Sequence, residues 1–256
     1  MRKFLPLFGL FCLFIAAACT DDDDRLAPDN VELNVDFKAL FNGDDLAIQS
    51  ATYDYPTGAT LKMGLFQYYV SDLELVDTDN NVVRLSDIEL IRYANATDDA
   101  TDRRTFTVPE GNYVSLRFGL GVKPDLNAQD PNNFSAADPL NENEFWNPGA
   151  RYVFAKIEAN ANLENDDLFD TGLSYHMGSD ALYTTVTFTV AGGFTLDGSA
   201  NDPTLVVIAD VLQALSGNGE TFDIADPAKQ RVHGGNQAIA QDIWDRLAGQ
   251  FQLQLR

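Results

Sequence analysis

The stretch Asn112-Tyr-Val-Ser-Leu-Arg-Phe-Gly-Leu-Gly-Val122 decides the fold. Apolar side chains take every second position along it, and these are Val114, Leu116, Phe118, Leu120 and Val122. The positions between them are small or polar (Ser115, Arg117, Gly119). A period of two is typical of a β-strand with one face buried and the other polar. This stretch therefore predicts a half-buried strand.

Three more stretches repeat strand signals. Thr184–Val190 alternates Val and Phe with Thr. Tyr69–Leu75 alternates in the same way and leads through Asp77–Asn81 into the apolar Val82–Leu85, which predicts a hairpin. Leu205–Ala209 is short and continuously apolar, as expected of a strand buried on both faces.

Helical periodicity is scarce and concentrates near the C-terminus. In Asn236–Ala248 the apolar side chains fall at helical spacing, with Trp244 on the core side, Asn236 as N-cap and Gly249 as the C-terminal stop. Two polar stretches, Asp125–Asn147 and Asn160–Thr171, are predicted to be long loops. The fold class is therefore all-β, mainly an antiparallel β-sandwich with long loops and a C-terminal helix.

The N-terminus indicates export. Arg2 and Lys3 precede the apolar run Phe4–Ile15, and three alanines then lead to Cys19. This order is typical of a secretory signal, and the apolar run is too short to span a bilayer. The ending resembles the bacterial lipobox, so residues 1–18 are predicted to be a lipoprotein signal peptide and Cys19 to be lipidated.

Residues 19–30 are predicted to be the lipidated cysteine and an acidic tether. Thr20–Asp24 reads TDDDD, and four adjacent carboxylates stay in solvent. An acidic run at this place resembles the surface-export signal of Bacteroidetes lipoproteins, although a plain spacer would look the same. We expect an outer-membrane lipoprotein of the cell envelope, held to the membrane by the lipid on Cys19, with a β domain spanning residues 31–256.

Cysteine usage and charge exclude several classes of function. Cys12 leaves with the signal and Cys19 carries lipid, so disulfides, thiolate metal sites and cysteine nucleophiles are excluded. The formal net charge of −22 excludes nucleic acid as a partner, because phosphates would be repelled. No GxSxG or HExxH motif occurs, and we expect no enzymatic activity. Asp98–Asp102 and Glu164–Asp170 could bind calcium, but solvated turns explain them better.

The chain has only two histidines, His176 and His233, and each is near a glycine. One histidine alone would more often have a structural hydrogen-bonding role. Two histidines brought together from distant segments could ligate a transition metal, and nitrogen donors without thiolate favour copper or zinc.

Further stretches carry a resemblance to a known family. They are Val31–Phe37, Gln67–Leu73, Val108–Tyr113, Leu116–Val122, Asn127, Trp146–Asn147, Tyr152–Glu158, Tyr175–Gly178 and the segment around His233. In order and spacing they resemble the MbnP-like family of exported copper-binding proteins, over about residues 31–251.

The resemblance implies a copper site. It implies that His176 and His233 are ligands and that Trp146 is converted to kynurenine by a partner dihaem peroxidase of the MauG-like kind, which would add an amine ligand. One position departs from the family pattern, because Glu144 stands where the family often has a first tryptophan. If that missing tryptophan is the modified one, Trp146 is simply a core residue.

Two functions follow from these observations. The first is a cell-envelope lipoprotein that captures or handles copper. The second is a surface lipoprotein that keeps the fold with a degenerate metal site and binds glycan or protein.

Overall fold

The computed structural model describes residues 29–141, 144–233 and 237–256. The predicted signal peptide, Cys19 and most of the predicted acidic tether lie outside the described residues, as does the predicted N-cap Asn236. No helix of the described residues is long and apolar enough to cross a membrane.

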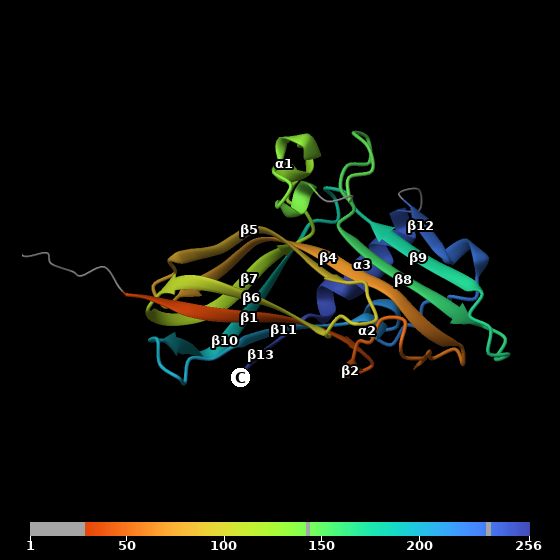
Figure 1. The fold of residues 1–256 in the computed structure, drawn as a ribbon, viewed down its shortest axis with the longest axis horizontal. Helices are drawn as coiled ribbons and strands as arrows, with labels where there is room; N and C mark the ends of the chain where they lie inside the picture. Colours follow the sequence, from red (N-terminus) through yellow and green to blue (C-terminus); the bar gives the residue numbers. More distant parts are fainter. Residues whose placement is uncertain (1–28, 142–143, 234–236) are drawn as a thin grey trace, which may run out of the picture.

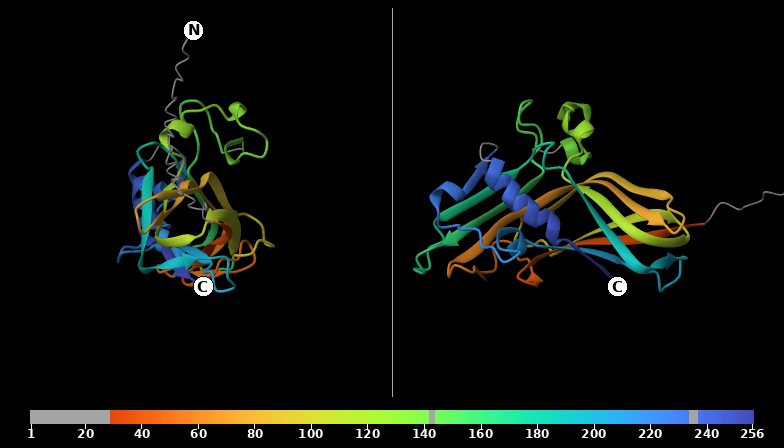
Figure 2. Two further views of the ribbon diagram at one scale, coloured as in Figure 1. Left: turned by 90° about the vertical axis from the view of Figure 1, so that its left-hand side faces the viewer. Right: turned by 180° about the vertical axis from the view of Figure 1, so that it is seen from behind.

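Two β-sheets of the described chain enclose one core (Figures 1 and 2). The five-stranded sheet contains β1 (Asn30–Phe41), β2 (Asp44–Asp45), β6 (Thr101–Pro109), β11 (Leu205–Asp210) and β13 (Gln252–Leu255). The eight-stranded sheet contains β3 (Tyr53–Asp54), β4 (Thr60–Asp77), β5 (Val82–Tyr93), β7 (Gly111–Leu120), β8 (Ala155–Asn162), β9 (Thr171–Met177), β10 (Thr184–Leu196) and β12 (Arg231–His233).

Helical elements are few and short, with one exception. They are α1 (Pro124–Asn127), α2 (Val211–Leu215), α3 (Gln237–Gln250) and the 3-10 turns η1 (Pro131–Asn133), η2 (Pro139–Asn141) and η3 (Pro227–Lys229). Only α3 is longer than five residues. The all-β prediction with a C-terminal helix is therefore confirmed.

Strand order explains where the candidate site lies. The larger sheet runs β10-β7-β4-β8-β9-β12, and almost all of its pairs are antiparallel. β4 is 18 residues long: its first half pairs with β8 and its second half with β7. It thus extends the sheet from the sandwich to the end formed by β8, β9 and β12 (Figure 1).

Helix α3 closes the core at this end of the molecule. Its Trp244 is fully buried, lies 6.1 Å from the Phe154 ring and donates a hydrogen bond from Nε1 to Thr184 Oγ1 at 3.0 Å. Burial of the indole stabilises the fold through its large apolar area, and the hydrogen bond avoids the cost of a buried N–H without a partner. The core position predicted for Trp244 is confirmed.

Two local predictions were wrong for identifiable reasons. Val114 is only half-buried, because a β-bulge shifts the register of β7 against β4 and places Tyr113 in the core instead. The helix also continues through Gly249 to Gln250, since β13 begins only at Gln252. The hairpin of β4 and β5, the strand β10 and the buried strand β11 agree with the sequence patterns.

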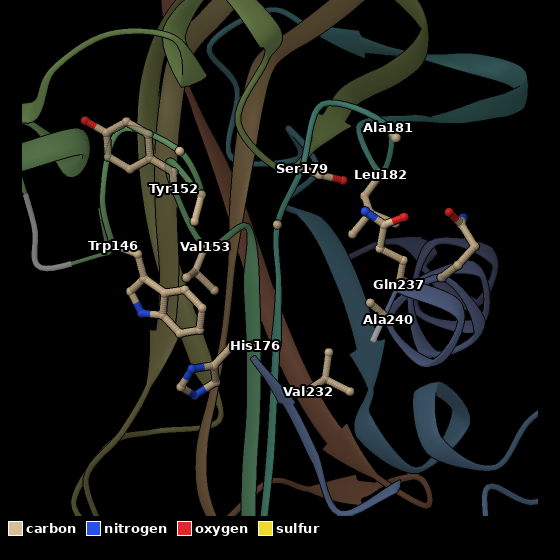
Figure 3. Close-up of a pocket in the computed structure, with 14 residues that line it drawn as sticks. Trp146, Tyr152, Val153, His176, Ser179, Ala181, Leu182, Val232, Gln237 and Ala240 are labelled. Atoms are coloured by element: carbon tan, nitrogen blue, oxygen red, sulfur yellow. The ribbon is translucent and has the colours of Figure 1, made fainter. Parts of the chain in front are cut away.

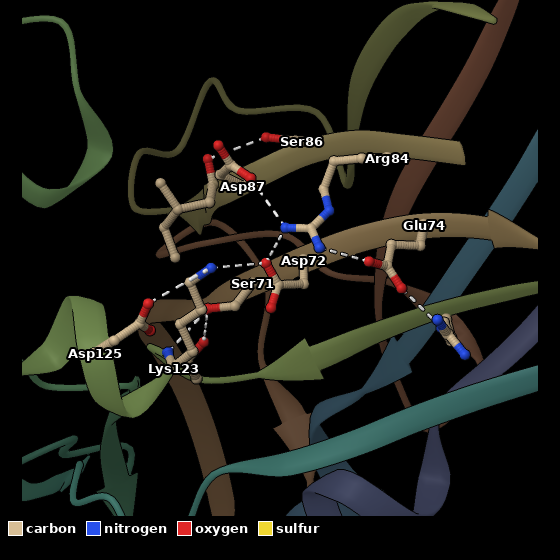
Figure 4. A network of polar contacts seen from close by, with 11 residues as sticks. Ser71, Asp72, Glu74, Arg84, Ser86, Asp87, Lys123 and Asp125 are labelled. Carbon is tan, nitrogen blue, oxygen red and sulfur yellow. Dashed lines mark hydrogen bonds and ion pairs between the residues drawn. The ribbon is translucent and has the colours of Figure 1, made fainter. Parts of the chain in front are cut away.

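β4 has a bulge of its own between Ser71 and Glu74, and a cluster of charged side chains surrounds it (Figure 4). Glu74 accepts from Arg84 and Arg117, each at 2.7 Å, while Asp72 accepts from Lys123 at 3.0 Å and from Arg84. Each of these charged side chains already has a partner of opposite charge. The cluster therefore links strands and is not a candidate ligand site.

Candidate metal centre

Strands β9 and β12 run parallel, and their register sets His176 directly beside His233. The two imidazole rings are stacked, with centroids 4.5 Å apart and 30° between their planes. Directly paired residues of neighbouring strands point to the same face of a sheet. The fold thus brings the two histidines of the chain together on one outer face.

Trp146 lies against both rings. Its ring centroid is 5.9 Å from that of His176 and 5.6 Å from that of His233. The indole is 39% exposed, so it is not the core residue considered as an alternative. The structure therefore groups all three residues singled out from the sequence, and Figure 3 shows Trp146 over His176.

A tight turn holds Trp146 in this position. Trp146 donates its backbone N–H to Arg151 O at 3.0 Å, and Arg151 donates to Asn147 O at 2.7 Å. Asn147 Oδ1 accepts from the backbone N–H groups of Gly149 and Ala150, both at 2.9 Å. Such side-chain acceptance is why Asn initiates turns.

Gly178, just after His176, allows the turn to approach the sheet. A side chain at this position would collide with the backbone of Tyr152 and Phe154. The close approach that this glycine allows is thus one of backbone to backbone.

Two polar side chains that the sequence patterns did not single out complete the group. Glu158 Oε1 lies 2.6 Å from His176 Nε2. Ser174 Oγ lies 3.2 Å from the same nitrogen and 3.0 Å from His233 Nε2. β8 and β9 pair Glu158 with Ser174, which places both on the face of the histidines. Strand alternation could have indicated this face, but the pairing of the strands was needed to choose these residues.

Burial lowers the pKa of His176 below its usual 6.5. Desolvation of the imidazolium is the main cause, and the nearby Lys156 ammonium also lowers the pKa, while the hydrogen bond to Glu158 opposes both. His176 is therefore predominantly neutral at pH 7, which is the state that binds metals.

Lys156, paired directly with His176 across β8 and β9, belongs to a buried ion pair beside the site. Its Nζ lies 2.5 Å from Glu144 Oε2, and Arg92 Nη1 lies 3.6 Å from Glu144 Oε1. Glu144 is only 2% exposed. Glu144 occupies the position where the MbnP-like family often has a first tryptophan. Its buried carboxylate is neutralised by Lys156 and Arg92.

Two hollows lie at the histidine group. A cavity of about 300 Å³ is lined by His176, Trp146, Tyr152, the loop after β9 and the start of α3 (Figure 3). A second, of about 250 Å³, is lined by Glu158, Ser174 and His233 among others.

Within the described ranges, no group of three or more His, Cys, Asp or Glu side chains is arranged to hold a metal ion. The calcium alternative in Asp98–Asp102 finds no support, because Asp98 accepts hydrogen bonds from the backbone of Ala94 and Asn95 and Asp102 pairs with Arg104. These carboxylates serve turns and ion pairs.

Fold and site together define a β-sandwich protein that carries two histidines and an exposed tryptophan at one end of its larger sheet. The family model MbnP matches residues 30–233, and the chain belongs to this family.

A solved structure, MbnP from Methylosinus trichosporium, is similar in fold. Its TM-score is 0.51 at 17% identity, and the match covers 73% of this chain and 78% of that chain. The comparison with curated proteins gives no match.

Proposed function

We propose that this protein binds copper at the cell envelope through His176 and His233, for copper capture or handling and not for catalysis. The observation that carries the proposal is the register of β9 and β12, which stacks the two imidazoles with centroids 4.5 Å apart. Membership of the MbnP family is consistent with it.

The donor atoms fit copper. Two imidazoles without thiolate suit copper or zinc, and copper leads zinc in affinity for such nitrogen sites. His176 also has a buried Nδ1 with no hydrogen-bond partner among the described residues, which is an available ligand atom. Bound copper would supply a redox-active or transferable ion, and the chain's own part is to orient the imidazoles and keep His176 neutral.

Trp146 is proposed as the third member of the site, after conversion to kynurenine. The conversion adds oxygen across the indole C2–C3 bond and then releases C2 as formate by hydrolysis, leaving an aryl amine. Adding the two oxygen atoms is a four-electron oxidation, for which two molecules of hydrogen peroxide would be reduced to water in a reaction catalysed by a dihaem peroxidase of the MauG-like kind. The partly exposed indole against both imidazoles supports this role.

Location completes the proposal. Lipidation at Cys19 would hold the domain at the outer membrane, on its periplasmic or its surface side. The signal-like order of residues 1–19 supports this.

Metal analysis after copper loading tests the copper site. The mature protein should retain about one copper ion per chain. The double variant His176→Ala/His233→Ala should retain none, whereas Asp99→Ala, at an exposed position, should behave as wild type. Equal retention by wild type and the double variant would contradict the proposal.

The alternative is a degenerate site on a surface lipoprotein that binds glycan or protein. The exposed Trp146 is the observation that favours it, because an aromatic ring at the surface can stack on a sugar. Absence of copper from wild-type protein, together with retention on a glycan array that Trp146→Ala abolishes, would select this function.

A further inference from the structure

Glu158 determines which nitrogen of His176 carries the proton. Its Oε1 lies 2.6 Å from His176 Nε2. An ionised carboxylate has acceptor atoms only, so Nε2 must donate. The short distance is that of a charge-assisted hydrogen bond. Ser174 Oγ, at 3.2 Å from the same nitrogen, offers a second, weaker acceptor.

The other nitrogen of His176 is then a lone pair without a partner. A neutral imidazole has a single N–H, and if Nε2 carries it, Nδ1 is an acceptor. Nδ1 is buried and has no hydrogen-bond partner within the described residues. A buried polar atom without a partner costs free energy and calls for an explanation, such as a ligand that binds there.

His176 and its hydrogen-bond partners border different hollows. Glu158, Ser174 and His233 line the smaller hollow, and none of them lines the larger cavity. His176 borders the larger cavity together with Trp146 (Figure 3). His176 thus borders the larger cavity, whereas Glu158, the acceptor for its Nε2, borders the smaller hollow.

From these contacts we infer that His176 binds the metal through Nδ1, and that Glu158 is a positioning residue that holds Nε2–H from the opposite side. The inference rests on the copper site proposed above. An outer carboxylate of this kind fixes the tautomer and the ring orientation and strengthens the imidazole as a donor. Ser174 joins the arrangement to His233, whose Nε2 lies 3.0 Å from the same hydroxyl.

Nitrogen NMR of the mature protein labelled only in histidine tests the assignment directly, because the chain has two histidines. Metal-free His176 should show a protonated Nε2 and an unprotonated Nδ1. Diamagnetic Cu(I) should then shift the Nδ1 resonance. A protonated Nδ1 in the free protein, or coordination through Nε2, would overturn the inference. If neither histidine responds to Cu(I), the copper site itself is wrong.

A pair of glutamate variants tests the role of Glu158. Glu158→Gln removes the charge from a partly exposed side chain, so the fold should persist. We expect about 10-fold weaker copper binding and a mixture of His176 tautomers, because the amide can also donate to Nε2. Glu164→Gln makes the same change at an exposed position of the β8–β9 loop and should change neither. Wild-type affinity together with a pure Nε2–H tautomer in Glu158→Gln would refute the positioning role.

Discussion

His176 and His233 stack on one another yet differ in burial. The His176 side chain is 11% exposed and hydrogen-bonded to Glu158, whereas His233 is exposed on the three-residue strand β12. The two histidines should therefore contribute unequally to the stability of the fold, although both are proposed metal ligands.

Replacing His176 should destabilise the metal-free protein more than replacing His233. His176→Ala removes a mostly buried ring and its hydrogen bond, and we expect a loss of about 1–2 kcal/mol in the free energy of unfolding. His233→Ala removes an exposed ring and should cost less than about 0.5 kcal/mol. Urea titration of both variants measures the difference. The opposite order of the two losses would contradict the burial difference.

Acid should destabilise the metal-free protein through His176. Its pKa is lowered mainly by burial, so between this lowered pKa and the usual 6.5 the unfolded chain binds more protons than the folded one. Stability should therefore fall as the pH drops through that window and recover as it rises. Urea unfolding at several pH values should show this dependence in wild type and a weaker one in His176→Ala. Equal slopes in both proteins would exclude His176 as the cause.

The Glu144–Lys156 ion pair should be important for stability. Lys156 is 13% exposed and Glu144 only 2% exposed, so Glu144→Gln leaves an ammonium without its closest partner. Breaking a buried pair in this way should cost about 3 kcal/mol. Asp45→Asn is the matched control, because Asp45 pairs with Lys38 at the surface and its loss should cost less than about 1 kcal/mol. Urea unfolding measures both losses. If they are similar, burial does not make the Glu144–Lys156 pair contribute more to the free energy of unfolding than a surface pair does.

Strand periodicity in the sequence was sufficient for the sandwich but not for the site. Half-buried strands such as β7 show their alternation directly, whereas the bulge at Val114 depends on how β4 and β7 pair. β12 has only three residues, too few for a pattern, so its register with β9 could not be predicted. Glu158 was one of 39 acidic residues, and only the pairing of β8 with β9 gives it a histidine neighbour.

Cys19 is predicted to anchor the protein by lipid. Cys19→Ser should leave uncleaved precursor or release soluble protein, because a serine hydroxyl cannot take the place of the thiol, whose sulfur forms a thioether with the diacylglyceryl group. Labelling with a radioactive fatty acid in the native host measures the modification. Label on the Cys19→Ser chain would show that the lipid is attached elsewhere.

Trp146, but not Trp244, should be modified in protein made by its native host. Trp146 is 39% exposed and lies against both imidazoles, whereas Trp244 is fully buried and donates to Thr184. An external oxidant can therefore reach only the first. Peptide mass spectrometry should show at Trp146 the change expected for exchanging one ring carbon for one oxygen, and the peptide with Trp244 serves as the internal control. Protein from a host without a dihaem peroxidase should lack the change. If Trp146 stays unmodified in the native host while copper is bound, the site consists of the two histidines without kynurenine, and Glu144 at the other family position explains the loss.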